Sequence, residues 1–112
     1  MIKLAVFDVD GTLVTKGNHR VPASCVHALN ELSRKGVKLA IASGRPPFAM
    51  EQSLLEQVSF DYFVCSNGAF VRNAQHEVLY HYSFTMEETR SLIHAFKKTD
   101  NALMFQCQDA AH

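Results

Sequence analysis

Two aspartates directly behind an apolar run are the side chains of this chain best suited to chemistry. They belong to the segment Asp8-Val9-Asp10-Gly11-Thr12. Residues two apart on a strand share a face and lie about 6–7 Å apart along it, at about 3.3 Å per residue. Asp8 could attack phosphorus as a nucleophile, because a carboxylate can form an aspartyl-phosphate. Asp10 could protonate the leaving oxygen and later activate water.

Charge makes a cation necessary for such a reaction. A carboxylate that attacks a phosphate dianion is repelled unless both are neutralised, and Mg²⁺ suits this because it takes oxygen ligands and keeps several waters. Gly11 allows the backbone to turn sharply away from the strand. The alternative interpretation is structural: both aspartates cap a loop or the following helix.

The elements that must position this pair follow from the hydrophobic pattern. Residues 2–9 form a short, nearly continuous apolar run, which is typical of a parallel strand covered on both faces. The expected order is a strand at 2–9, a helix from Pro22 to a stop at Gly36, a strand at 37–42, a helix at 47–57 and a strand at 62–65. This alternation predicts an α/β fold with a parallel sheet, because such crossovers are right-handed.

The pattern changes after residue 68. Two strands at 69–72 and 77–82 around a polar turn predict a hairpin. Thr85 and Glu88 then form a capping box that opens a third helix. A last strand is expected at 102–107.

Polar residues follow the second and third predicted strands, where an open α/β sheet binds its ligands. Ser43 ends the second strand, and a hydroxyl beside free amide groups at a helix N-terminus is a good anion site. Arg45 is a candidate for substrate or phosphate contact, and Asn67 follows the third strand. The purely structural alternatives are a helix N-cap for Ser43, a surface ion pair for Arg45 and a simple turn for Asn67.

The segment around Asp8 and Asp10 resembles motif I of the haloacid dehalogenase (HAD) superfamily. The resemblance implies a Rossmann-like parallel sheet, with Asp8 as nucleophile and Asp10 as general acid/base. It also implies that Asp8 and the backbone carbonyl of Asp10 ligate Mg²⁺. The phosphate- or substrate-binding residues it implies are Gly11, Thr12, Ser43, Gly44, Arg45 and Asn67. Because dehalogenases lack the second aspartate, Asp10 favours phosphoester hydrolysis or phosphoryl transfer.

The string Leu39-Ala40-Ile41-Ala42-Ser43-Gly44-Arg45-Pro46, together with Asn67-Gly68, resembles the Cof-type branch, whose members are mostly sugar-phosphate phosphatases. By this resemblance, residues 1–79 are part of the HAD core and residues 80–112 begin an α+β cap. The family's motif III lysine and acidic motif IV belong after the cap, and neither is found in this sequence. We therefore expect a catalytically incomplete site that is inactive alone.

Three functions stay open. The first is a Mg²⁺-dependent phosphatase of the Cof type that acts on small phosphorylated metabolites, with sugar phosphates as the expected class. The second is a phosphotransferase or mutase, which keeps the phosphoryl group. The third is a non-catalytic binding or interaction remnant that retains half of the site.

Composition narrows the class of protein. The 112 residues carry eleven Lys+Arg and eleven Asp+Glu, and this formal net charge of zero gives no footprint for nucleic acid or an anionic membrane. Cys25, Cys65 and Cys107 are widely spaced, which favours buried thiols in a reducing, cytoplasmic compartment. No run of apolar residues is close to the length of about 18 residues that a membrane-spanning helix needs. The first strand is central in the family, so here its open edge is expected to favour self-association.

Overall fold

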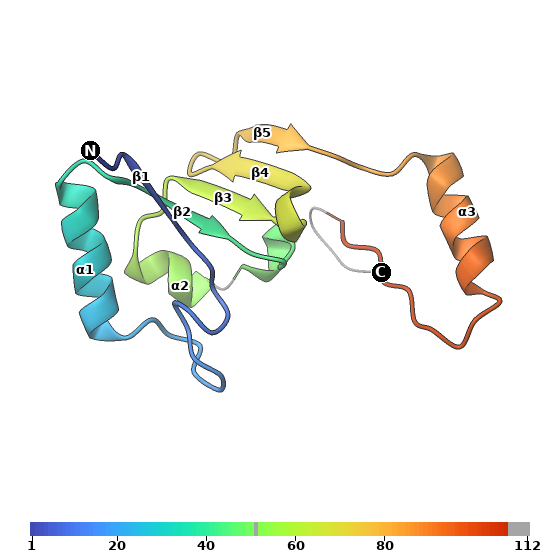
Figure 1. The fold of residues 1–112 in the computed structure, drawn as a ribbon, viewed down its shortest axis with the longest axis horizontal. Helices are drawn as coiled ribbons and strands as arrows, with labels where there is room; N and C mark the ends of the chain where they lie inside the picture. The colour runs from blue at the N-terminus through green and yellow to red at the C-terminus, as the bar shows by residue number, and fades with distance from the viewer. Residues whose placement is uncertain (51, 108–112) are drawn as a thin grey trace.

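The computed structural model describes residues 1–50 and 52–107. Its elements, in chain order, are β1 (Leu4–Phe7), α1 (Ala23–Arg34), β2 (Lys38–Ala42), the 3₁₀ turn η1 (Pro47–Ala49), α2 (Gln52–Gln57), β3 (Tyr62–Cys65), the 3₁₀ turn η2 (Ser66–Gly68), β4 (Phe70–Asn73), β5 (Val78–His81) and α3 (Met86–Phe96). Figure 1 shows this order as a colour ramp along the ribbon.

The strands form one sheet in the order β1-β2-β3-β4-β5. β1, β2 and β3 run parallel, with Val6 opposite Ala40 and Ile41 opposite Phe63. β4 and β5 continue the sheet as an antiparallel hairpin. The α/β class and the parallel pairing of the first three strands, both predicted from the apolar runs, are confirmed.

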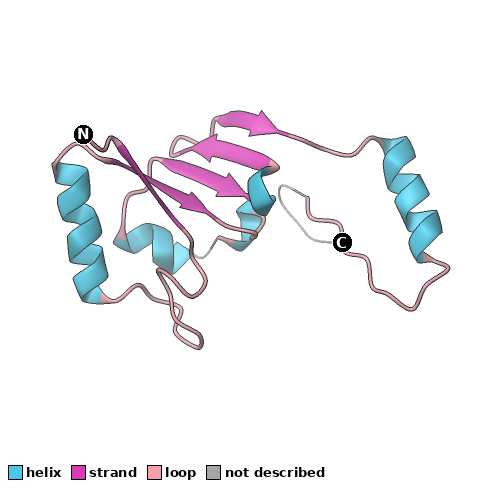
Figure 2. Cartoon of the chain, viewed as in Figure 1, coloured by secondary structure: helices cyan, strands magenta, loops and turns pink. Residues whose placement is uncertain are grey.

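Helices α1 and α2 pack on the same face of the sheet (Figure 2). Leu29 of α1 and Leu54 of α2 belong to one buried cluster with Leu39 and Ile41 of β2. Residues of β1 alternate accordingly: Ala5 and Phe7 pack against that cluster, whereas Leu4 and Val6 are exposed. The buried face therefore fixes the register of the parallel strands, and with it where each strand ends.

The helix predicted over 47–57 is divided in two. The 3₁₀ turn η1 ends at Ala49, and α2 begins at Gln52. Met50, directly after η1, has an extended backbone with φ −73° and ψ 113°. The extended backbone lets the Met50 side chain reach the core, whereas Phe48 is 44% exposed. Core packing at Met50 thus overrides the local preference for one continuous helix.

The C-terminal third of the described chain follows the prediction only in part. Thr85 caps α3, and the capping box with Glu88 is confirmed. The strand expected at 102–107 is wrong, because these residues form no strand and Gln106 makes only an isolated bridge. α3 lies apart from the sheet, beyond an extended connection (Figure 1).

No helix in the described residues combines the length and the apolar composition that a bilayer span requires. The expected division into a core over 1–79 and the beginning of a cap over 80–112 stays a prediction.

Candidate active site

In the loop after β1 the apolar residues are buried, which leaves the two aspartates exposed. Val9, Leu13 and Val14 are buried. The carbonyl oxygen of Val9 accepts hydrogen bonds from the backbone N–H groups of Thr12, Leu13 and Val14 at 3.2, 3.0 and 3.1 Å. Gly11 makes the turn possible with φ +81°, a conformation that L-residues rarely adopt. Asp8 and Asp10 are left exposed on either side of Val9.

One cavity, called the first cavity below, lies at the carboxyl ends of the three parallel strands. It measures about 390 Å³ and is lined by Asp8, Ala42, Ser43, Gly44, Val64, Asn67 and Gly68. Parallel strands bring these ends to one edge of the sheet, which is where open α/β sheets bind ligands. A carboxylate, a hydroxyl and an amide side chain, each from a different strand end, therefore face one space.

The loops after β2 and β3 are joined by hydrogen bonds. Ser43 N–H donates to the carbonyl of Val64 at 2.9 Å, and Asn67 N–H donates to the carbonyl of Ser43 at 3.2 Å. Ser66 and Asn67 both adopt positive φ, 49° and 54°, and Gly68 follows at 94°. Asn tolerates this left-handed conformation better than most residues. The hydrogen bonds thus hold the backbone of Asn67 against that of Ser43.

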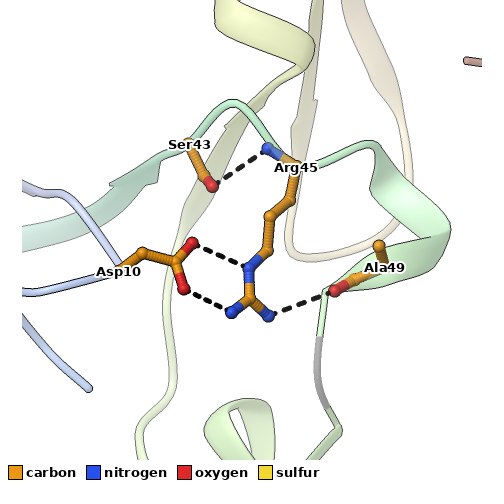
Figure 3. Close-up of polar contacts among 4 residues, drawn as sticks. All are labelled: Asp10, Ser43, Arg45 and Ala49. Carbon is orange, nitrogen blue, oxygen red and sulfur yellow. Dashed lines mark hydrogen bonds and ion pairs between the residues drawn. The ribbon is translucent and has the colours of Figure 1, made fainter. Parts of the chain in front are cut away.

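Asp10 forms a bidentate ion pair with Arg45 (Figure 3). Arg45 Nε donates to Asp10 Oδ2 at 2.9 Å, and Arg45 Nη2 donates to Asp10 Oδ1 at 2.5 Å. These hydrogen bonds are the largest cause that holds the pKa of Asp10 below its usual value. Desolvation opposes them, and the charge of Arg45 adds to them. Asp10 is therefore an anion in this arrangement.

The second cavity lies on the Asp10 side of the loop. It measures about 380 Å³ and is lined by Asp10, Gly11, Val14, Thr15, Lys16, Gly17, Asn18, His19 and Arg45. Asp8 lines the first cavity and Asp10 the second. The two residues nevertheless come from one turn.

The donor set available to a metal ion consists of oxygen atoms. Asp8 contributes a carboxylate that lines the first cavity, and the backbone carbonyl of Asp10 lies two residues away. Within residues 1–50 and 52–107, no group of three or more His, Cys, Asp or Glu side chains is placed to hold a metal ion. This fits Mg²⁺, which is usually held by one or two carboxylates together with waters and substrate phosphates. It does not fit a structural zinc site, which needs four protein ligands.

The residues predicted from the sequence are distributed as follows. Asp8, Ser43, Gly44 and Asn67 share the first cavity, and Asp10, Gly11 and Arg45 line the second. Thr12 lies in the same turn but lines neither of these two cavities. The prediction missed Ala42, Val64 and Gly68 as lining residues. Ala42 ends the predicted second strand, Val64 lies one residue before the end of the third, and Gly68 follows Asn67.

Comparison with known proteins places this geometry in a family. The sequence profile of the haloacid dehalogenase-like hydrolases matches residues 5–112. The HMP-PP phosphatase of Klebsiella pneumoniae is 31% identical over 96 residues, which are 85% of this chain and 35% of that protein. The HMP-PP phosphatase of Cronobacter sakazakii is 29% identical over 104 residues, which are 92% of this chain and 38% of that protein.

Solved structures agree. The phosphatase BT1666 of Bacteroides thetaiotaomicron matches with a TM-score of 0.88 at 26% identity, over 99% of this chain and 41% of that chain. The sugar phosphatase BT4131, of HAD subclass IIB, matches with a TM-score of 0.80 at 31% identity, over 97% of this chain and 42% of that chain.

The chain belongs to the haloacid dehalogenase-like hydrolases. The resemblance to the HAD superfamily and its Cof-type branch, drawn from motif I and the residues around Ser43, is confirmed. The chain spans between 35% and 42% of the length of the four proteins compared above.

Proposed function

We propose that this chain carries the nucleophile half of a phosphomonoester hydrolase site. The substrates are small phosphorylated metabolites, with sugar phosphates as the expected class. The observation that carries the proposal is the first cavity, where Asp8 and Ser43 face one space at the ends of parallel strands. A phosphoryl group in that space meets a carboxylate nucleophile and a hydroxyl donor together.

The proposed reaction assigns a step to each carboxylate. A carboxylate oxygen of Asp8 attacks phosphorus, and the bond from phosphorus to the leaving oxygen breaks as an aspartyl-phosphate forms. Asp10, an anion beside Arg45, takes up a proton from solvent before the first step and gives it to the leaving oxygen. It then accepts a proton from the water that hydrolyses the aspartyl-phosphate. Ser43 donates a hydrogen bond to a phosphoryl oxygen. Asp8 and the backbone carbonyl of Asp10 would hold Mg²⁺, which neutralises the repulsion between carboxylate and phosphate.

We also propose that the site in this chain is catalytically incomplete. The described residues offer one carboxylate and one carbonyl to the metal ion, and no group of three metal-binding side chains. This observation favours a second candidate for the isolated chain, a module that binds Mg²⁺ and phosphate without turnover. A cytoplasmic location is part of the proposal, supported by three free thiols, Cys25, Cys65 and Cys107, in the described residues.

Binding of inorganic phosphate to the 112-residue chain, measured by calorimetry with and without Mg²⁺, tests the proposal. We expect Mg²⁺ to tighten phosphate binding in the wild-type chain and to have no such effect in Asp8→Asn. Asp100→Asn, an exposed change outside both cavities, should behave as the wild type. A wild-type affinity that is the same with and without Mg²⁺ would overturn the proposed function.

Turnover is tested separately with an aryl phosphate and Mg²⁺. We expect no phosphate release from the isolated chain. Release that disappears in Asp8→Asn would support the hydrolase chemistry and overturn the incompleteness of the site. Release that persists in Asp8→Asn would overturn the assignment of Asp8 as nucleophile.

A further inference from the structure

We infer that Arg45 is a positioning residue, which holds the Asp10 carboxylate in one orientation and does not bind the phosphoryl group itself. The inference rests on the proposed function, because it concerns the residue that moves protons in that reaction. The sequence alone left two tasks open for Arg45, contact with phosphate or substrate and an ion pair with a carboxylate. The two tasks give different experimental results.

The contact between Arg45 and Asp10 restricts how the Asp10 carboxylate can rotate. Two parallel N–H···O bonds join the planar guanidinium of Arg45 to both oxygens of Asp10. A bidentate contact of this kind fixes the rotation of a carboxylate as well as its distance. The Asp10 side chain is 60% exposed, whereas that of Arg45 is 23% exposed. Arg45 is therefore the better anchored partner, and Asp10 the one that needs orienting.

The backbone of Arg45 is itself held on both sides. Its N–H donates to Ser43 Oγ at 3.1 Å, and its carbonyl accepts from the N–H of Ser66 at 2.9 Å. Arg45 Nη1 also reaches the carbonyl oxygen of Ala49 at 3.5 Å (Figure 3). The side chain of Arg45 thus extends from a backbone that is held in place, as the precise placement of a functional group requires.

The location of the guanidinium separates it from the phosphoryl group. The cavity with Asp8 is lined by Ser43, Gly44 and Asn67 but not by Arg45. Arg45 lines the second cavity together with Asp10. In the proposed reaction the phosphoryl group binds beside Asp8, whereas the guanidinium nitrogens of Arg45 already donate to Asp10 and to the carbonyl oxygen of Ala49.

The orientation of Asp10 can be measured directly. The three-bond couplings between Hα and the two Hβ protons of Asp10, recorded by nuclear magnetic resonance, report its side-chain rotamer. We expect one dominant rotamer in the wild-type chain and averaged couplings in Arg45→Gln. Arg45→Lys should also give averaged couplings, because a single ammonium cannot make the fork. Arg34→Gln, which breaks the Arg34–Glu31 pair on α1, is the matched control and should leave Asp10 unchanged.

Affinity for inorganic phosphate in the presence of Mg²⁺ gives the second readout. We expect Arg45→Gln and the wild type to agree within about twofold. Loss of a direct charged contact would cost about tenfold, equivalent to about 1.4 kcal/mol. Ser43→Ala, which removes a proposed phosphate donor, is the positive control.

The outcomes separate this inference from the proposed function. Asp10 couplings that do not change in Arg45→Gln and Arg45→Lys, or an affinity that falls tenfold in Arg45→Gln, would overturn the inference. The inference is supported if Arg45→Gln binds phosphate as tightly as the wild type while its Asp10 couplings are averaged. A wild-type chain that binds no phosphate overturns the proposed function, while the couplings still decide whether Arg45 orients Asp10.

Discussion

The side-chain oxygen of Asn67 lies 2.9 Å from the point that a Cβ atom on Gly44 would occupy. Real Cβ atoms have essentially no contacts this short, so only glycine at residue 44 leaves room for the Asn67 amide in its present place. The backbone N–H of Asn67 is at the same time tied to the carbonyl of Ser43. Gly44 thus lets the loop after β3 close onto the loop after β2 at the edge of the first cavity.

Gly44→Ala should change the site more than the fold. The new methyl group displaces the end of the Asn67 side chain, which rotates away, while the backbone at residue 44 needs no positive φ. We expect the free energy of unfolding to change by less than about 1 kcal/mol. Affinity for phosphate should fall, and the side-chain amide resonances of Asn67 should shift.

The double variant checks this explanation. In an Asn67→Ala background, Gly44→Ala should have no further effect on phosphate affinity, because the displaced group is already gone. Additive losses in the two variants would mean that Gly44 acts independently of Asn67.

Much of the fold could be predicted from local patterns. Leu39, Ala40 and Ile41 of β2 are buried, and a parallel strand covered on both faces needs apolar residues on both, so composition alone marks it. The apolar run that became β1 was expected to be covered on both faces too, but Leu4 and Val6 are exposed because the helices pack on one face only. The division of the helix over 47–57 could not be predicted, because it depends on Met50 reaching a core built by distant residues. Local propensity does not contain that information.

The candidate active site could likewise be predicted only where local sequence patterns determine it. Asp8 and Ser43 could be assigned because each directly follows a predicted strand, and strand ends meet at one edge of a parallel sheet. The pair between Asp10 and Arg45, 35 residues apart, could not be predicted, because sequence gives the charge of a long side chain but not its partner. The positive φ of Ser66 also carries no sequence signal, since serine has no preference for that conformation.

Asp61 should be a stabilising link between β2 and the start of β3. Its Oδ1 accepts from Lys38 Nζ at 2.8 Å, and its Oδ2 accepts from the N–H of Leu39 at 2.9 Å. Lys38 is largely exposed, so solvent weakens the ion pair. We expect Asp61→Asn to lower the free energy of unfolding by about 1 kcal/mol at neutral pH, measured by urea denaturation.

The effect of Asp61 should depend on pH in a defined direction. Desolvation raises the pKa of Asp61, but the hydrogen bonds from Lys38 and Leu39 and the charge of Lys38 outweigh it, so the pKa lies below its usual value. Its contribution is therefore complete above the unfolded pKa of about 3.9 and is lost as the pH falls through the folded value. The difference between wild type and Asp61→Asn should be constant above about pH 5 and shrink in more acid solution. A difference that grows on acidification would contradict this account.

The three thiols should react at different rates in the folded chain. Cys65 is buried, and burial raises its pKa although the charge of Arg72 opposes the shift. The thiolate is the reactive form, so Cys65 is protected both by its environment and by its low ionised fraction. Alkylation followed by mass spectrometry should label Cys107 first, Cys25 next and Cys65 last. Equal alkylation rates of the three thiols in buffer, as expected for the chain unfolded in urea, would show that the core around Cys65 opens readily.

The edge of β1 should drive self-association of this chain. β1 is the first strand of the sheet order, so one row of its backbone groups has no strand beside it in the described residues. Leu4 and Val6 are 48% and 54% exposed on the face that α1 and α2 do not cover. An open apolar edge is a template for pairing with another chain, and a formal net charge of zero provides no repulsion between copies.

Light scattering with a charged variant of this edge tests the association. We expect the wild-type mass to exceed the monomer value of 12.5 kDa and to rise with concentration. Val6→Lys should remain monomeric, because a lysine on an edge strand must be desolvated before a second strand can pair there. Met104→Lys adds the same charge at an exposed position away from the sheet and should associate as the wild type does. A wild-type monomer at every concentration, with slowly exchanging amides throughout Leu4–Phe7, would show that the edge is protected within one chain.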